Sequence, residues 1–460
     1  MKLVTDETNI RSNIYSSYNN NSTTEIDSTF LNTDLELREE HSAIVEAISL
    51  PISRQGNEAN QGALGCLVAN LSLLAVHQSQ GIFKDGLALP LNTHAYGPDS
   101  RFGYRAIKRA FDHLRLHGYI YVRMGDHRSE RATLLLPSDK LKALLAQSPD
   151  SDRRAARNLA KIGKRSGVVK MSFKEADRPT QVIQDVDTQA ALDTINEANR
   201  SHQFSLVTRL PEHLDLVSHM GEVRDDTLYI SEDAVTLDRV YRASMDQGGR
   251  YYAPLTNLQR GLRDGLQIGG QPVVECDYVS LHPRMLYSLA GKIPPRADLY
   301  ELPSLTHEDN KRLRPAIKCA LLCMPNLPNW RLYWKTFAKA YAVAQRKAAA
   351  ASKFRGEQAP LFPEVDEQMW HWLKKEIVKT HSEIAHTFAK GAGLTLQKLD
   401  GDMATYIGIR FAELSLPVWM LHDGFFTAPA YQTLLVDTMV VAYRLYTNDY
   451  SVSANIVKVS

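Results

Sequence analysis

Residues 272–289 read PVVECDYVSLHPRMLYSL and place a carboxylate between a short apolar strand and a helix. Val273 and Val274 are typical of a buried strand that ends at Asp277. Ser280 then begins a stretch with apolar residues at helical spacing, namely Leu281, Met285, Leu286 and Leu289. A buried carboxylate is costly unless it is paired or bound to a metal, and acidic residues also commonly cap helices. On this stretch alone, Asp277 fits a helix cap and a metal ligand equally well.

A second carboxylate lies between apolar runs near the C-terminus, where residues 416–429 read LPVWMLHDGFFTAP. The pattern predicts a β-hairpin with His422 and Asp423 at its tip, and Gly424 allows the tight turn. Asp277 and Asp423 would then come from separate strands. Two such carboxylates can hold two Mg²⁺ ions about 4 Å apart, which activate an attacking oxygen and stabilise a leaving pyrophosphate.

Two cations lie in a helix predicted over residues 307–323. Arg314 and Lys318 are one turn apart, so they point in the same direction. A pair of cations on one face matches a triphosphate, with Lys318 at the α- or β-phosphate and Arg314 at the γ-phosphate. Without a further motif, a solvated basic face is the default interpretation of this spacing. Pro315 lies between the two and bends or restarts the helix.

The segment around Asp277 resembles a known motif. Asp277 and Tyr278, followed six residues after the tyrosine by Arg284, resemble motif A of family-A DNA polymerases. Upstream, Gly-Arg at residues 249–250 and Asn-Leu-Gln at residues 257–259 resemble the segment that precedes motif A in that family.

Two further segments follow in the order of the same family. Arg314 with Lys318 on a helix resembles motif B. His422 with Asp423 resembles motif C, which in the related single-subunit phage-type RNA polymerases also continues with a small residue and an aromatic. The resemblance covers roughly residues 245–430.

The resemblance implies an α+β fold with a right-hand polymerase palm and fingers. It implies template-directed nucleotidyl transfer, with Asp277 and Asp423 as ligands of two Mg²⁺ ions. Lys318 would act in catalysis. The residues expected to bind the nucleotide are Arg314, Lys318, His282 and Tyr278, and those expected to contact nucleic acid near the site are Arg250, Arg284 and His422.

Departures from the family pattern leave the substrate open. His282 stands where the DNA polymerases have a Glu that takes part in excluding the ribose 2′-hydroxyl, and Leu322 and Asn326 replace two aromatic positions of motif B. The expected activity is a DNA polymerase without proofreading, since no exonuclease-like acidic cluster precedes the palm segment. A primase or RNA polymerase is one alternative. A DNA-binding replication initiator or regulator with an inactive palm is the other.

Residues 99–137 form a unit of their own in the N-terminal half. Asp99 or Ser100 is expected to cap a helix that ends at Gly118, and strands at residues 119–124 and 132–136 flank a turn. With the helices before it, this order predicts a winged-helix domain that binds DNA. The cations expected to contact DNA are Arg101, Arg105, Lys108 and Arg109 on the helix, with Arg128 and Arg131 at the wing tip. A protein-interaction module fits the same pattern.

Two further expectations concern polar residues near the motifs. Residues 248–252 predict a turn that presents Arg250, for which a surface turn and a nucleic-acid contact both fit. Asp400 and Asp402 precede a helix predicted over residues 403–414, and both most simply cap it.

Composition and residue order predict four regions in the 460-residue chain. They are a disordered segment at residues 1–38, the winged-helix domain at 39–150, a basic linker at 151–205, and a polymerase-like domain at 206–460. The linker either follows nucleic-acid phosphates or serves as a solvated tether. The net charge of +2 says little, so any nucleic-acid signal has to come from local patches.

The remaining features bear on compartment and partners. The hydrophobic content of 44% is ordinary for a soluble protein. No run of 18 apolar residues occurs, so we expect no membrane span. Cys319 and Cys323 share a helical face without a second pair nearby, which favours packing over a zinc site. We expect a cytoplasmic protein whose partners are DNA and nucleoside triphosphates, tied to replication of a plasmid, phage or other mobile element. The sequence names no protein partner.

Overall fold

The structure is a computed structural model that divides into two compact units with a mixed α+β fold. Unit 1 comprises Met1–Val186, Gln203–Asp238 and Ala253–Asn257, and unit 2 comprises Asp187–His202, Arg239–Tyr252 and Leu258–Ser460. The chain therefore passes between the units repeatedly, rather than once in the predicted linker. The described residues are 28–38, 42–49, 57–80, 85–91, 95–96, 100–125, 133–146, 160–173, 180–208, 210, 212–331 and 333–460.

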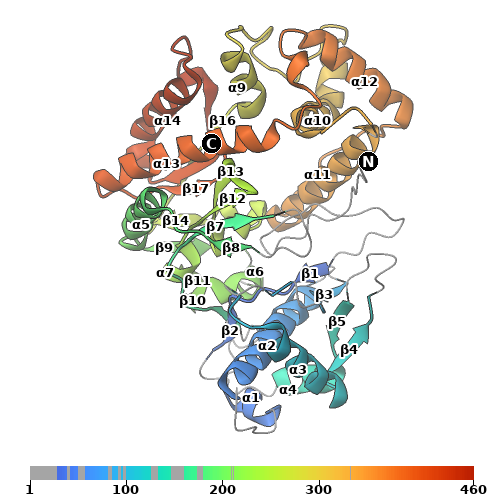
Figure 1. The fold of residues 1–460 in the computed structure, drawn as a ribbon, viewed down its shortest axis with the longest axis vertical. Coiled ribbons are helices and arrows are strands. Elements are labelled where there is room, and N and C mark those ends of the chain that lie inside the picture. The colour runs from blue at the N-terminus through green and yellow to red at the C-terminus, as the bar shows by residue number, and fades with distance from the viewer. Residues whose placement is uncertain are drawn as a thin grey trace, which may run out of the picture. The chain divides into compact units, whose positions relative to one another are not determined.

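The N-terminal part of unit 1 is built on helices α2 (Asn57–Ser79) and α3 (Tyr104–Leu116), which pack together beside a four-stranded sheet (Figure 1). The sheet has the order β1 (Ser28–Phe30), β3 (Gly86–Leu89), β5 (Thr133–Pro137) and β4 (Ile120–Arg123). Strand β1 is parallel to β3, and the other pairs are antiparallel. Helices α1 (Ser42–Ala47) and α4 (Asp139–Ala146) complete this part.

Helix α3 forms because its apolar residues recur on one face, which is buried in the core with α2. Ile107, Phe111 and Leu114, which recur at helical spacing, are buried there. The expected cap is wrong, since the N-cap is Gly103 and no side chain caps the helix; Asp99 lies outside the described residues. Gly118 follows the helix in the left-handed region at φ 71°, as its position predicted.

Helix α2 is long and apolar. Its segment Glu58–Ser79 is long and apolar enough to cross a membrane by length and composition, a property that a count of consecutive apolar residues overlooked. In the structure, 72% of the apolar window is buried inside the protein, as in the core helix of a globular domain. Leu64, Leu67 and Leu71 of this helix contribute to the core.

Residues expected to be disordered or to form a linker carry strands and a helix where the structure describes them. Strand β2 (Leu35–Leu37) pairs with β6 (Ala160–Ile162), and β7 (Val169–Ser172) pairs with β8 (Gln181–Val182). The disorder prediction is therefore wrong for residues 28–38, and residues 1–27 lie outside the described residues. The rest of unit 1 contains β9 (Phe204–Val207), α6 (Glu212–Val217), β10 (Gly221–Arg224), β11 (Thr227–Ile230) and α7 (Glu232–Val235).

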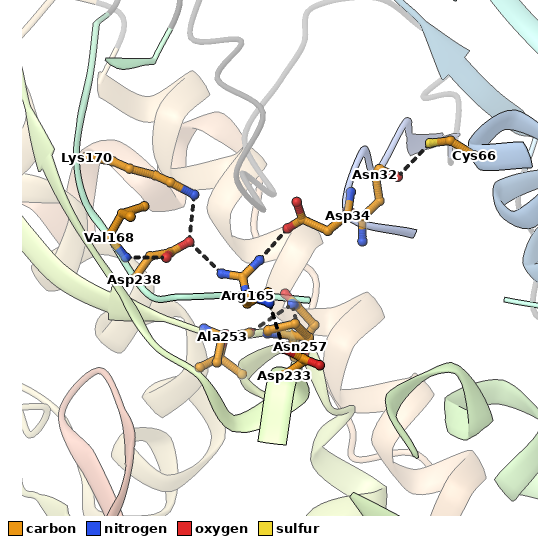
Figure 2. Close-up of polar contacts among 12 residues, drawn as sticks. Asn32, Asp34, Cys66, Arg165, Val168, Lys170, Asp233, Asp238, Ala253 and Asn257 are labelled. Atoms are coloured by element: carbon orange, nitrogen blue, oxygen red, sulfur yellow. Dashed lines mark hydrogen bonds and ion pairs between the residues drawn. The ribbon is translucent and has the colours of Figure 1, made fainter. Parts of the chain in front are cut away.

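Arg165, one of the cations of the expected linker, is held at the centre of a polar network in unit 1 (Figure 2). Its guanidinium pairs with Asp34 and, at 2.5 Å, with Asp238, while its backbone N–H donates to Asp233 at 2.6 Å. Asp238 also accepts from two donors of the same region, the Lys170 ammonium at 2.7 Å and the Val168 backbone N–H at 2.9 Å. Arg165 and Lys170 thus bind carboxylates of unit 1, and neither alternative for the linker, contact with nucleic-acid phosphates or a solvated tether, describes these two residues.

Unit 2 contains the sheet that carries Asp277. Its antiparallel order is β17 (Trp419–Leu421), β18 (Gly424–Thr427), β16 (Val274–Tyr278) and β19 (Val457–Val459). Cys276 lies opposite both Phe425 and Val459. Helices α9 (Leu281–Leu289), α13 (Gly393–Glu413) and α14 (Gln432–Thr447) pack together beside this sheet. The sequence predicted the strand and the hairpin because both are short apolar runs that end at charged residues.

The other helices and strands of unit 2 lie before and between the strands of this sheet along the chain. They are α5 (Val186–Arg200), β12 (Asp238–Arg242), β13 (Ser244–Tyr252), α8 (Arg260–Arg263), β14 (Leu266–Ile268), β15 (Gln271–Pro272), α10 (His307–Cys323), α11 (Tyr333–Arg355) and α12 (Glu367–Thr380). The first residue of α5 and the first residue of β12 belong to unit 1.

Candidate active site

Three carboxylates gather at one end of the β16–β18 pair. Glu275 and Asp277 project from the same face of β16, because alternate residues of a strand share a face. Asp277 lies opposite Gly424, and a Cβ added to Gly424 would stand 3.6 Å from both the Asp277 Oδ1 and the Glu275 Oε1 atoms. The Tyr278 N–H donates to the Asp423 carbonyl at 3.2 Å, which ties the hairpin turn to the strand. The two carboxylates named from the sequence are therefore neighbours, and Glu275 adds a third.

The charge of this group is only partly balanced. Burial, followed by the Asp423 and Glu275 carboxylates, raises the pKa of Asp277 to about 7. The Lys318 and Arg260 cations act in the opposite direction. A buried carboxylate with anionic neighbours is a site at which an added cation lowers the electrostatic energy.

The carboxylates suit a magnesium ion that shares its ligands with a substrate. Among the described residues, no group of three or more His, Cys, Asp or Glu side chains is arranged to hold a metal ion by itself. Mg²⁺, however, is usually bound through one or two carboxylates together with substrate phosphates and water. Asp277 and Asp423 carry oxygen donors of that kind, and burial together with two anionic neighbours raises the pKa of Asp277 to about 7.

The left-handed backbone conformation at the hairpin tip, expected at Gly424, is adopted by His422 instead. The residue with left-handed backbone is His422, at φ 59°, whereas Gly424 has an ordinary φ and lies against the carboxylates. The imidazole stacks edge-on against Tyr252 at 5.5 Å. Burial and then the Arg250 cation lower the pKa of His422 to about 4, so its ring is neutral. Its Nδ1 atom is buried without a hydrogen-bond partner among the described residues.

The two cations of helix α10 lie over one aromatic ring. The Arg314 guanidinium is 5.1 Å and the Lys318 Nζ 5.7 Å from the centroid of Tyr300, so both point the same way, as their spacing predicted. Lys318 is close enough to Asp277 to lower its pKa. Arg314 forms an ion pair with Asp298. Pro315 lies inside the helix, which continues through it.

Two residues named from the resemblance to motif A lie elsewhere. Tyr278 points to the face of the strand opposite that of Asp277, because neighbouring residues of a strand alternate between its two faces. It is 4% exposed, and its hydroxyl donates to the Met439 carbonyl at 2.6 Å. Its expected place in the nucleotide site is therefore wrong. Arg284 donates to the backbone carbonyls of Val279 and Ala297, at 2.9 Å and 2.6 Å, and so links the segments before and after α9.

Arg250 forms a buried cluster with two polar residues of unit 2. It lies in strand β13 and not in the expected turn, and its Nε donates to both carboxylate oxygens of Asp400 at 3.0 Å. His282 Nε2 lies 2.8 Å from Asp400 Oδ2. Burial alone would raise the pKa of Asp400, but Arg250 and His282 hold it below its usual value. A small pocket beside the cluster is lined by Arg250, Tyr251, Asp400, Gly401, Ala404, Met420 and His422.

Asp400 and Asp402 do not cap a helix as expected. Helix α13 begins at Gly393, so both carboxylates lie in its interior. Asp402 forms ion pairs with Arg239, at 2.6 Å, and with Lys398. Each acidic residue thus serves a different basic partner on a different side of the helix.

The cations of the winged-helix prediction differ in their surroundings. Arg105 and Arg109 are exposed on α3. Arg101 pairs with Glu36, and Lys108 pairs with Asp112 at 2.5 Å. Arg128 and Arg131, which the wing was expected to offer, lie outside the described residues.

Sequence reasoning missed Glu275, Tyr300 and Asp400 as residues of the site. Glu275 had a usable signal, because it precedes Asp277 by two residues in a predicted strand. Tyr300 and Asp400 had none, since each meets its partners through contacts between distant segments.

No protein-family model matches the sequence, and no curated protein matches it. Among solved structures, the POL domain of Pol1 from M. smegmatis in complex with DNA primer-template and dNTP is similar at 11% sequence identity with a TM-score of 0.26. The alignment covers 92% of this chain and 66% of that chain, so this chain spans less than two thirds of it. A TM-score this low does not establish a shared fold, and the chain is described by its own elements as mixed α+β.

Proposed function

We propose that this protein is a template-directed nucleotidyltransferase, with a palm formed by the β17-β18-β16-β19 sheet and fingers that include α10. The observation that supports it most is that Asp277 and Asp423, predicted as a pair from separate segments, lie together beside Lys318. Carboxylates near cations on a helix match the charges of a nucleoside triphosphate with its magnesium.

In this proposal Asp277 and Asp423 hold two Mg²⁺ ions, which would supply Lewis-acid stabilisation of the charge on the transferring phosphoryl group. Lys318 contacts the phosphates of the nucleotide and stabilises the charge that develops on the leaving pyrophosphate. Arg314 contributes when a phosphate displaces Asp298 from its guanidinium. Arg250 and His422 line a pocket together, apart from the pair of cations on α10, and in this proposal they serve the nucleic acid.

The exposed cations of α3 support a second part of the proposal, in which the N-terminal part of unit 1 is a winged-helix module that binds DNA. Arg105 and Arg109 project from its helix without an ion pair among the described residues. That this activity serves the replication of a plasmid, phage or other mobile element stays a prediction.

Incorporation of labelled nucleotide on a primed template with Mg²⁺ tests the proposal. Parallel reactions with deoxyribo- and ribonucleotides, each with and without primer, separate a DNA polymerase from a primase or RNA polymerase. Asp423→Asn should reduce incorporation by about a thousandfold or more, as expected when a metal ligand is lost. Its circular dichroism spectrum and its DNA affinity should match the wild type.

Two results would contradict the proposal. A wild-type protein that binds DNA and yields no product in any reaction would favour an initiator or regulator with an inactive palm. An Asp423→Asn variant that extends a primer at the wild-type rate would show that the metal assignment is wrong.

A further inference from the structure

We propose that Asp400 is a positioning residue that orients Arg250 toward the nucleic-acid strand being extended, and not toward the incoming nucleotide. The inference rests on the proposed nucleotidyl transfer and names which of the two substrates the Asp400–Arg250–His282 cluster serves. Asp400 touches neither substrate in this account and acts through Arg250.

The burial of Asp400 calls for a specific role. Its side chain is 1% exposed in the interior of α13, where an isolated carboxylate would be strongly destabilising. Replacing such an ion pair by apolar residues is often neutral for stability, so a buried pair is weak support for a purely structural purpose. The position of this pair beside His422 and Asp423 points to the site instead.

The contacts of Arg250 leave one part of its guanidinium available. Nε donates to both oxygens of Asp400, and Nη2 bonds to Asp400 Oδ2 and lies 3.3 Å from His282 Nε2. No partner of Nη1 occurs in the described part of the chain. A planar guanidinium held along one edge has a fixed direction for its remaining donors. Asp400, to which His282 Nε2 donates, therefore determines where Nη1 points.

The backbone is shaped to allow this arrangement. Helix α13 and strand β13 approach so closely at Gly401 that an added Cβ would stand 2.3 Å from the Gly249 carbonyl oxygen. Gly249 itself has φ 77°, a conformation that side chains disfavour. The close approach places Asp400 beside Arg250, which follows Gly249 in the chain.

The charges around the carboxylates separate into two groups. Lys318 and Arg314 on α10 share the ring of Tyr300 and match a triphosphate. Arg250 lies with His422 along the pocket at α13, and the Arg250–Asp400 ion pair as a whole carries no net charge. A neutral pair with an oriented N–H suits a hydrogen bond to a base edge or sugar of the strand end better than attraction to a phosphate.

Steady-state primer extension with Asp400→Asn tests the inference, with primer-template and nucleotide varied separately. We expect kcat/KM for primer-template to fall about tenfold or more and KM for nucleotide to stay within about twofold. Because Asn leaves the charge of Arg250 unbalanced, the salt slope of DNA binding should also become steeper by about one unit. A role in packing alone would produce neither the division between the two substrates nor the steeper slope.

Asp402→Asn is the matched control. It lies two residues further along the same helix, loses an ion pair of the same kind, and serves Arg239 and Lys398 instead of Arg250. Both KM values should stay within about twofold of the wild type. His282→Gln, which alters the donor that holds the Asp400 carboxylate beside Arg250, should shift kcat/KM for primer-template in the same direction as Asp400→Asn by a smaller factor.

The outcomes are distinguishable. If Asp400→Asn does not fold, as judged by circular dichroism, His282→Gln decides, since His282 lies at the edge of the cluster. An active wild type whose folded variants leave primer-template kinetics unchanged, or lose nucleotide affinity instead, overturns this inference alone. A wild type that is inactive in every reaction overturns the proposed function and this inference with it.

Discussion

Asp238 in unit 1 and Asp400 in unit 2 are buried carboxylates with two basic partners each, yet their surroundings differ. Asp238 is 7% exposed and binds Arg165 and Lys170, and Arg165 also binds Asp34, so carboxylates occupy both sides of that guanidinium (Figure 2). In the part of the chain that the structure describes, Asp400 is the one carboxylate bonded to Arg250. A buried ion pair is therefore uninformative by itself. In the proposal made above, a functional cluster differs from a structural one in that a donor stays available beside a pocket.

The largest effect is expected from breaking the structural cluster. Asp238→Ala leaves the Arg165 and Lys170 cations in a buried site without their shared carboxylate, so the free energy of unfolding should fall by about 3–5 kcal/mol. Urea denaturation followed by circular dichroism measures it. The folded fraction should keep its KM for primer-template, in contrast to Asp400→Asn. A loss below about 1 kcal/mol would show that the network contributes little.

The second prediction concerns two cations of unit 1 that, unlike Arg165, form no ion pair with a carboxylate among the described residues. Arg105 and Arg109 are exposed on α3, so their joint reversal to Glu should weaken binding to duplex DNA about 10- to 100-fold and lower the salt slope by about two units. Filter binding across a salt series measures both.

Lys108→Glu is the control for that pair, because Lys108 already binds Asp112 and should contribute less to DNA binding. Unchanged affinity and slope in the double variant would make the N-terminal part a protein-docking or structural module.

The third prediction compares Asp400, whose basic neighbours hold its pKa below the usual value, with Asp277, whose pKa is raised. The folded-state pKa of Asp277 is raised to about 7 from an ordinary value of 3.8. Between these pH values the folded state binds more protons than the unfolded state, so this group lowers stability progressively as pH rises toward 7. Asp277→Asn should therefore stabilise the metal-free protein by about 2 kcal/mol at pH 8.

The same substitution should have almost no effect near pH 4, where Asp277 is protonated in the folded state. Thermal unfolding in chelator at the two pH values measures the difference. A variant equally or less stable at pH 8 would mean that the carboxylates are further apart in solution. Primer extension by the same variant should be lost, because the substitution removes a carboxylate that is proposed to hold magnesium.

The smallest effect is expected at a surface pair. Arg101 and Glu36 form an ion pair with side chains 40% and 30% exposed, and pairs of this kind contribute about 0–1 kcal/mol. Glu36→Gln should lower the free energy of unfolding by less than about 1 kcal/mol. A loss as large as that of Asp238→Ala would mean that burial does not explain the difference between the two classes of pair.

Local patterns identified several elements of unit 2 because they depend on short-range signals. The strand before Asp277, the hairpin at His422 and Asp423, and the shared direction of Arg314 and Lys318 all follow from alternation or helical spacing. The resemblance to motif A, by contrast, misplaced Tyr278, because it does not encode which face of the strand is buried.

The order of the units along the chain could not be predicted. Residues 187–202 belong to unit 2 and residues 203–238 to unit 1, although a boundary near residue 205 looked natural from composition. A fragment that begins there loses α5, whose Leu192 and Ile195 are buried and whose Asn199 accepts from the Val418 N–H at 3.4 Å. Separating a catalytic fragment at that point removes part of its own core.

The sequence by itself determined where carboxylates and cations end strands and line helix faces, since these positions follow from the periods of 2 and 3.6 residues. Only the tertiary structure decided which of them meet. Asp400 lies 150 residues from Arg250 and 118 from His282 in the chain, and Gly401 allows the backbone approach that unites them. Local patterns carry no information about such contacts, because the burial that makes them favourable exists only after distant segments have packed.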